Sequence, residues 1–170
     1  HRLSGKGRVM QARAGEEAAD GYTVLVTGFG PFPKVPVNPT AAVAAALDGQ
    51  TVAGARVVGR VLPVDWVAAL PCLDAAVAEI RPEALIMLGV APRDGIQVER
   101  VARNRCDARP DVDGATGPSQ VEAGGSAELS TTLPWEALCA VGAAPSDDAG
   151  SYLCNAVFYR ALRQHAQVPQ

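Results

Sequence analysis

Cys154 is the residue of this sequence best placed to act as a nucleophile. It lies in the segment SYLCNAVFYRAL, at the start of a helix that the spacing of apolar residues predicts over 152–166. The free N–H groups and the dipole of a helix N-terminus stabilise an anion, so we expect a lowered pKa for a thiol there. The alternative is that Cys154 is a small buried apolar residue, the role that we assign to Cys72, Cys106 and Cys139.

A thiol nucleophile also needs a base that takes its proton and later gives it to the leaving amine. Histidine is the most common base of this kind, and the sequence contains two, His1 and His165. His165 follows Cys154 by eleven residues, which places it about 16 Å farther along a continuous helix. We therefore expect His165 to be an exposed residue near the helix C-terminus and not a partner of the thiol.

The rest of the sequence alternates between predicted strands and predicted helices. Asn38 followed by Pro39 indicates the start of a helix that ends near residue 47. Residues 84–90 are apolar on both faces, which is typical of a central parallel strand. The alternation predicts a single-domain, three-layer α/β/α sandwich with a mostly parallel or mixed central sheet. The other expected elements are strands over 22–27, 57–62 and 97–102, helices over 65–80 and from about 134, and a loop over 103–125.

The composition is that of one globular domain with an ordinary surface. The 170 residues are 19% charged with a formal net charge of -3, which argues against nucleic-acid-binding proteins and disordered chains. No apolar run approaches the roughly 18 residues that a membrane-spanning helix needs. The four cysteines form no CxxC pair, so we expect free thiols and no metal site. We predict a disordered tail over residues 1–20, which lack the apolar run of a signal peptide, and one domain over 21–170.

Three segments, in order, resemble the pyroglutamyl peptidase I family of cysteine peptidases. VTGFGPFPKVPVNPT, at residues 26–40, resembles the opening strand and Phe-bearing loop of that family. IQVERVARNRCDARPDVDG, at residues 96–114, resembles the stretch that carries its catalytic glutamate. SYLCNAVFYRAL resembles its nucleophile segment. Together the three segments span most of the chain after residue 20.

Carried over position by position, the resemblance implies a role for seven residues. Cys154 corresponds to the nucleophile, and Glu99 to the acidic member of the catalytic group. The implied substrate-binding residues are Phe29 and Phe32, which would sandwich the flat pyrrolidone ring, Asn38, which would hydrogen-bond it, Tyr152, a third aromatic wall, and Arg109, near the active centre. The alternatives are that Phe29 and Phe32 are ordinary core residues and that Glu99 is a surface strand residue.

The resemblance implies a cysteine exopeptidase, or omega peptidase, that hydrolyses the amide bond after an N-terminal pyroglutamyl residue of peptides and proteins. Hydrolysis would proceed through an acyl-enzyme on the thiol. The resemblance further implies no metal or organic cofactor, a cytoplasmic location, a homo-oligomer that is often a tetramer, and peptide substrates without nucleic-acid or membrane partners.

The catalytic base of this family is a histidine on a strand that follows the last helix, and the sequence given ends at Gln170, before such a strand. We therefore expect weak or absent peptidase activity from these residues alone. One alternative is an inactive or truncated homologue that serves as a binding module for pyroglutamyl N-termini. Another is a dinucleotide-binding domain, since Gly28 and Gly30 follow a strand, although Pro33 occupies the third glycine position of that fingerprint.

Overall fold

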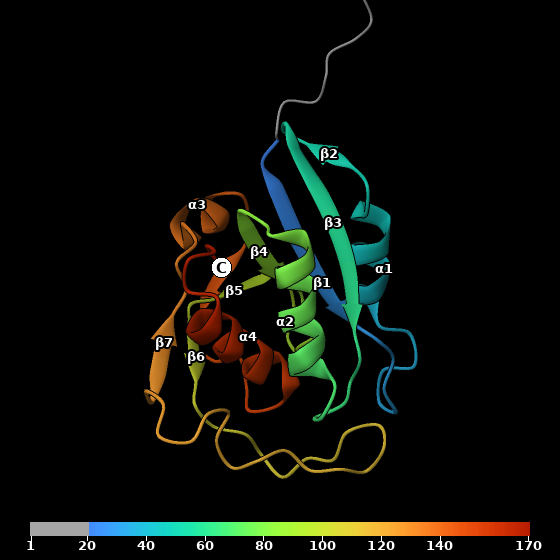
Figure 1. The fold of residues 1–170 in the computed structure, drawn as a ribbon, viewed down its shortest axis with the longest axis vertical. Coiled ribbons are helices and arrows are strands. Elements are labelled where there is room, and N and C mark those ends of the chain that lie inside the picture. Colours follow the sequence, from blue (N-terminus) through green and yellow to red (C-terminus); the bar gives the residue numbers. More distant parts are fainter. Residues whose placement is uncertain (1–20) are drawn as a thin grey trace, which may run out of the picture.

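The computed structural model describes residues 21–170, and the disordered tail expected over 1–20 lies outside them. The largest sheet has four strands in the order β2-β3-β1-β4 (Figure 1). β3 and β4 run parallel to β1, whereas β2 is antiparallel to β3, so the sheet is mixed. The strands are β1 (Thr23–Phe29), β2 (Thr51–Val52), β3 (Ala55–Leu62) and β4 (Ala84–Met87).

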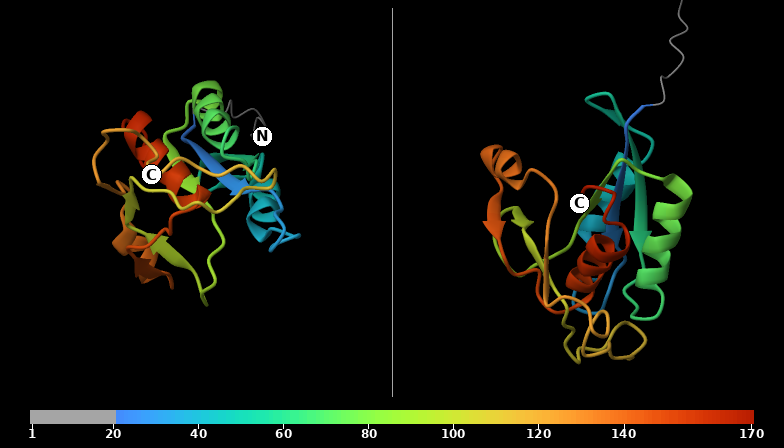
Figure 2. Two further views of the ribbon diagram at one scale, coloured as in Figure 1. Left: turned by 90° about the horizontal axis from the view of Figure 1, so that it is seen from below. Right: turned by 60° about the vertical axis from the view of Figure 1, so that its left-hand side comes forward.

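Helices cover both faces of this sheet. α1 (Pro39–Leu47) lies on one face and α2 (Ala69–Ile80) on the other (Figure 2). α4 (Leu153–Gln164) packs beside α2, and residues of both helices join Leu25 and Phe29 of β1 in one buried cluster. The predicted three-layer α/β/α sandwich with a mixed central sheet is therefore confirmed.

α1 has the predicted bounds and lies close against the sheet. Asn38 caps its N-terminus, because the Asn38 Oδ1 accepts hydrogen bonds from the Thr40 N–H at 3.1 Å and the Thr40 hydroxyl at 2.8 Å. β1 and β3 present glycines to this helix. A Cβ on Gly28 would collide with the backbone of Thr40, and one on Gly59 with that of Ala44. The close approach therefore requires glycine at both positions.

The sequence predicts a central strand over residues 84–90, and this prediction is wrong for the part of the chain that the structure describes. β4 pairs only with β1 and lies at the edge of the four-stranded sheet, where Ile86 is 41% exposed. On its outer side, the Leu85 N–H donates to the Pro169 carbonyl at 2.9 Å. The strand ends at Met87, so the residues that follow it are free to approach α4.

The strand predicted over residues 97–102 is divided into two, each in a separate two-stranded sheet. The change of partner occurs at Arg100, whose N–H donates to Ser146 O at 2.7 Å and whose carbonyl accepts from the Thr131 N–H at 2.8 Å. Because Arg100 bonds to both partners, Glu99 is held immediately beside the second sheet. The strands are β5 (Gln97–Glu99) with β8 (Ala144–Ser146), in parallel, and β6 (Val101–Arg103) with β7 (Glu128–Ser130), antiparallel.

The predicted long loop is confirmed, and residues 104–127 run past the carboxyl ends of the parallel strands (Figure 1). Asn104 organises one end of it. Its Nδ2 donates to Glu122 O at 2.7 Å and Gly125 O at 3.2 Å, and its Oδ1 accepts from the Glu122 N–H at 2.9 Å. The short helix α3 (Trp135–Ala140) follows β7, close to its predicted start.

His165 is not the exposed residue that the sequence predicts. Its side chain is only 14% exposed, and its Nε2 lies 2.8 Å from Oδ1 of Asp74 on α2. Nη2 of Arg160 donates to Oδ2 of the same carboxylate at 2.6 Å. Burial raises the pKa of Asp74, but the hydrogen bonds and charges of Arg160 and His165 outweigh it, so the net pKa is lowered. This cluster joins the end of α4 to α2.

Replacing Asp74 by asparagine is expected to lower the free energy of unfolding at pH 7 by about 1–3 kcal/mol, because it removes the charge that Arg160 and His165 share. Since the folded pKa of Asp74 is lowered, its stabilisation is complete above the unfolded pKa of about 4 and is lost as the pH falls through the folded value. Urea unfolding from pH 3 to 7 measures this. The difference between the two proteins should shrink toward the acid end, whereas the exposed Asp94→Asn should change stability little throughout.

Candidate active site

The Cys154 thiol lies in the first turn of α4, at the carboxyl end of the parallel strands. The backbone N–H groups of Val90 and of Cys154 itself lie close enough to the sulfur to lower the pKa of the thiol. Gly89 passes directly beside it, since a Cβ at that position would stand 2.8 Å from the sulfur. The segment that follows β4 and the start of α4 therefore enclose the thiol between two backbone amides.

The helix start does not lower the pKa of this thiol as the sequence predicts. Burial, the largest influence, raises the pKa of Cys154 to about 11. The two backbone N–H groups and the positive charge of Arg109 act in the opposite direction, while the negative charge of Glu99 adds to the increase. Desolvation disfavours the thiolate more than the amides favour it, so the resting thiol is protonated at neutral pH.

The alkylation rate of Cys154 by iodoacetamide is therefore expected to rise about tenfold per pH unit from pH 8 and to level off only near pH 11. Cys72, which is exposed on α2, serves as a reference for access of the reagent in the same sample. Peptide mapping after timed exposure measures both rates. A Cys154 rate that levels off below pH 9 would contradict the effect of burial.

Glu99 is the last residue of β5, and its side chain is partly buried, with 27% exposed. Its Oε1 lies 3.7 Å from Nη1 of Arg93, while its Oε2 is buried and has no hydrogen-bond partner among the residues described. Arg93 is itself held, because its Nη1 donates to Ser146 Oγ at 3.1 Å and its Nη2 to Asp148 O at 2.9 Å. Glu99 thus has one oxygen near a fixed cation and one oxygen available inside the site.

Arg109 and Tyr152, both predicted to bind the substrate, contact each other beside the start of α4. The guanidinium of Arg109 lies 4.9 Å from the centre of the Tyr152 ring, and Trp66 meets the same ring edge-on at 5.3 Å between centroids. The Tyr152 hydroxyl donates to Pro110 O at 3.1 Å, and the Trp66 Nε1–H donates to Arg109 O at 3.1 Å. Asp107 pairs with Arg109 at 3.2 Å. The loop that carries Arg109 is therefore fixed by aromatic and polar contacts.

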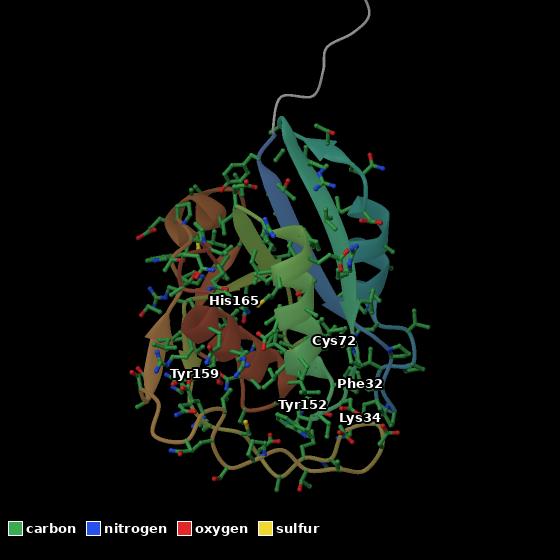
Figure 3. The ribbon with its side chains drawn as sticks, in the orientation of Figure 1. Phe32, Lys34, Cys72, Tyr152, Tyr159 and His165 are labelled. Carbon is green, nitrogen blue, oxygen red and sulfur yellow. The ribbon has the colours of Figure 1, made fainter. Side chains whose placement is uncertain are left out.

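Phe29 and Phe32 lie at the end of β1 but differ in burial. Phe29 is 5% exposed and belongs to the main core cluster, whereas Phe32, Tyr152 and Cys154 are partly buried and border that cluster. Figure 3 shows Phe32 and Tyr152 at the same lower end of the molecule. Asn38 lies behind this loop, where its Nδ2 donates to Gly30 O at 3.0 Å in addition to the α1 cap. The phenylalanine loop is thereby attached to α1.

His165 is remote from the thiol. It follows the last turn of α4, and Figure 3 places it at the opposite end of that helix from Tyr152, which precedes the first turn. It is the single histidine of residues 21–170, and its ring is paired with Asp74. Within these residues no histidine lies beside Cys154.

Four free cysteines are found, as predicted. Among residues 21–170, no group of three or more His, Cys, Asp or Glu side chains is arranged to hold a metal ion. None of the helices described there is both long enough and apolar enough to cross a membrane.

A partly buried thiol at a helix start, within the fields of a carboxylate and a guanidinium at the carboxyl ends of parallel strands, is the arrangement of a cysteine hydrolase on an α/β/α fold. The sequence model of the family described as "Pyroglutamyl peptidase" matches residues 22–169. The chain belongs to the pyroglutamyl peptidase family.

Relatives and solved structures agree with this membership. The pyrrolidone-carboxylate peptidase of Mycobacterium bovis is 38% identical over 161 residues, covering 85% of this chain and 70% of the relative. The pyrrolidone-carboxylate peptidase of Pyrococcus furiosus is 40% identical over 152 residues, covering 84% of this chain and 73% of the relative. A mutant pyrrolidone carboxyl peptidase from P. furiosus superposes with a TM-score of 0.81 at 38% identity, over 85% of this chain and 74% of that one. The pyrrolidone carboxyl peptidase from Thermococcus litoralis superposes with a TM-score of 0.80 at 39% identity, over 85% of this chain and 70% of that one. These names do not favour the inactive-module alternative.

Three parts of the site were not predicted from the sequence. These are the Val90 N–H group, the close passage of Gly89 and the pairing of Arg93 with Glu99. The close passage of Gly89 could have been predicted, because a glycine that follows an apolar strand permits close approach of the backbone to a reacting group. Nothing in the residue types pointed to the Val90 amide, since every residue other than proline carries one.

Proposed function

We propose that Cys154 attacks the carbonyl carbon of an N-terminal pyroglutamyl residue, so that this chain acts as the cysteine exopeptidase its family membership indicates. The sulfur forms a bond to that carbon, the amide C–N bond breaks, and the leaving amine takes a proton. Water then hydrolyses the thioester and releases free pyroglutamate. The observation that carries the proposal is the position of the Cys154 sulfur in the first turn of α4, directly beside Gly89, in a chain that matches the pyroglutamyl peptidase family over residues 22–169.

The same two N–H groups are suited to stabilise the oxyanion of the tetrahedral intermediate. They belong to Val90 and Cys154 and lie near the sulfur, next to which the oxyanion forms. Glu99, with one free buried oxygen, is suited to orient a base or the attacking water. Because the thiol pKa is about 11, a base is required at neutral pH. The histidine base of the family has no counterpart beside Cys154 among residues 21–170.

Because Phe29 is 5% exposed and belongs to the core, the substrate ring is proposed to lie between Phe32 and Tyr152 with Phe29 beneath, and not between Phe29 and Phe32 as the resemblance implies. A pyroglutamyl ring is flat, neutral and amide-bearing, so aromatic faces recognise it while a charged N-terminus is rejected. Arg109 is held against Tyr152 by a cation–π contact and supports that wall. Asn38 contributes by holding the loop, with one Nδ2 hydrogen on Gly30 O and the other left for the ring.

The proposal also covers the substrates, the cellular location and the oligomeric state of the protein. Peptides with a pyroglutamyl N-terminus are the partners, the location is cytoplasmic, and the chain forms a homo-oligomer, a tetramer by family resemblance. Light scattering coupled to size-exclusion chromatography measures the last point. A single species with the mass of one chain across the micromolar range would contradict it.

The function is tested by fluorophore release from a pyroglutamyl amide, with the prolyl amide as the matched substrate that lacks the ring carbonyl. We expect cleavage of the pyroglutamyl amide alone, abolished by alkylation of Cys154. From the 170 residues by themselves we expect weak turnover at neutral pH that rises toward pH 11, because no histidine assists the thiol in residues 21–170. Equal rates on both amides, or turnover that survives alkylation, would overturn the proposal.

A further inference from the structure

Asn155, the residue after the nucleophile, has its side chain turned away from the site and into the protein. It is 1% exposed. Its Nδ2 donates to Arg103 O at 2.8 Å and Arg105 O at 3.0 Å, and its Oδ1 accepts from the Arg103 N–H at 2.8 Å. One side-chain amide therefore joins the first turn of α4 to the end of β6 by three hydrogen bonds.

We propose that Asn155 is a positioning residue that sets where the Cys154 sulfur lies relative to Glu99. The inference rests on the proposed function, in which both groups serve one reaction. β6 follows β5 after the single residue Arg100, and Glu99 ends β5. A connection from Asn155 to β6 therefore determines the separation between the thiol on α4 and the carboxylate on β5.

The N-terminus of α4 has no side-chain cap. Its N-cap residue is Tyr152, which makes no side-chain capping hydrogen bond. The preceding residue, Ser151, is held through Asp107, since its hydroxyl donates to Asp107 Oδ2 at 2.9 Å and its carbonyl accepts from the Asp107 N–H at 2.8 Å. Asn155 supplies the corresponding connection on the inner side of the helix, toward β6.

The three bonds require a carboxamide. Two carbonyl oxygens need two donors, and one N–H needs an acceptor, which the side chain of asparagine provides at this length. Aspartate has the same shape but would place an oxygen against the carbonyls of Arg103 and Arg105, where it repels them. An apolar residue would leave three backbone groups without partners.

Asn104 is a matched control within the same chain. It is also buried, at 7% exposed, and it makes the same set of bonds, with Nδ2 donating to two carbonyls and Oδ1 accepting from one N–H. Its partners, Glu122 and Gly125, belong to the loop over 104–127 and not to α4. Because Asn104 lies between Arg103 and Arg105, its substitution disturbs the same stretch of backbone but leaves the Asn155 side chain that connects it to α4 in place.

The test compares Asn155→Asp with Asn104→Asp by three measurements on the full chain. These are the midpoint of urea unfolding, the ratio of Cys154 to Cys72 alkylation at pH 9, and kcat and KM for the pyroglutamyl amide. We expect both variants to lose stability. Only Asn155→Asp should lower kcat by about 100-fold with little change in KM, since a small displacement of a reacting group has that effect. It should also raise the alkylation ratio at least about fivefold, because a released helix start exposes the half-buried thiol.

An alkylation ratio that is the same in both variants, or an unchanged kcat in Asn155→Asp, would overturn the inference. If Asn155→Asp does not fold, Asn155→Ser removes the repulsion, keeps one donor and one acceptor, and is judged by the same ratio. If the unsubstituted chain releases no fluorophore at any pH, the weak turnover proposed for these 170 residues is contradicted, whereas the alkylation ratio still decides whether Asn155 positions the thiol.

Discussion

Replacing Cys154 by serine is expected to lower kcat/KM for a pyroglutamyl amide by at least about a thousandfold, without a comparable loss of stability. A hydroxyl is a far weaker nucleophile than a thiolate in a site that offers no base tuned for it. Serine is slightly smaller than cysteine and fits beside Gly89, so the fold should be retained. Steady-state kinetics and the midpoint of thermal unfolding measure the two effects.

Cys72→Ser is the control for this substitution, because that thiol is exposed on α2 and takes no part in the site. It should leave both kcat and KM within about twofold of the unsubstituted chain. Retention of more than a tenth of the activity by Cys154→Ser would show that another group is the nucleophile.

A methyl group added at Gly89, in Gly89→Ala, is expected to lower kcat/KM strongly because it would collide with the Cys154 thiol. The new Cβ would lie 2.8 Å from the Cys154 sulfur and 3.4 Å from the Cys154 Cβ, so the thiol or the segment after β4 must move. A displacement of this size at a reacting atom lowers kcat/KM by about 100-fold. Gly89 does not have a positive φ, so alanine is compatible with its backbone and the effect arises from the contact with sulfur.

Gly30→Ala provides the comparison. The same methyl group there would meet Leu62 O at 3.7 Å, an ordinary contact. Intact folding with an unchanged alkylation rate of Cys154 is expected for Gly30→Ala, whereas Gly89→Ala should change that rate severalfold. Similar alkylation rates and similar turnover in both variants would mean that Gly89 does not determine the position of the thiol.

Local sequence signals predicted most of the fold because they act between near neighbours. The Asn38-Pro39 pair marked the start of α1, since a cap and a helix-compatible proline are local features. Within residues 21–170, the apolar run at 84–90 does not form the predicted central strand, because apolar residues indicate burial but not which segments bury them. Leu85 is buried in the core cluster, yet β4 forms the edge of the four-stranded sheet.

The sequence supplied the residue types proposed for the site, but not the electrostatics around Cys154. The position of Cys154 at a helix start followed from the sequence around it. The direction of its pKa did not, because desolvation depends on segments far away in the sequence, including Gly89 and Val90. His165 shows the same limit, since its partner Asp74 lies 91 residues away in the sequence. Pairings of that kind carry no local signature.

Locating the residue to which a pyroglutamyl group becomes attached tests most directly whether Cys154 is the nucleophile. The chain is incubated with pyroglutamyl chloromethyl ketone, in which the thiolate displaces chloride to form a stable thioether, and the adduct is located by peptide mass spectrometry. We expect one adduct per chain, on Cys154, suppressed by excess free pyroglutamate. An adduct on Cys72 at an equal or greater rate, or labelling of Cys154 that free pyroglutamate does not slow, would contradict it.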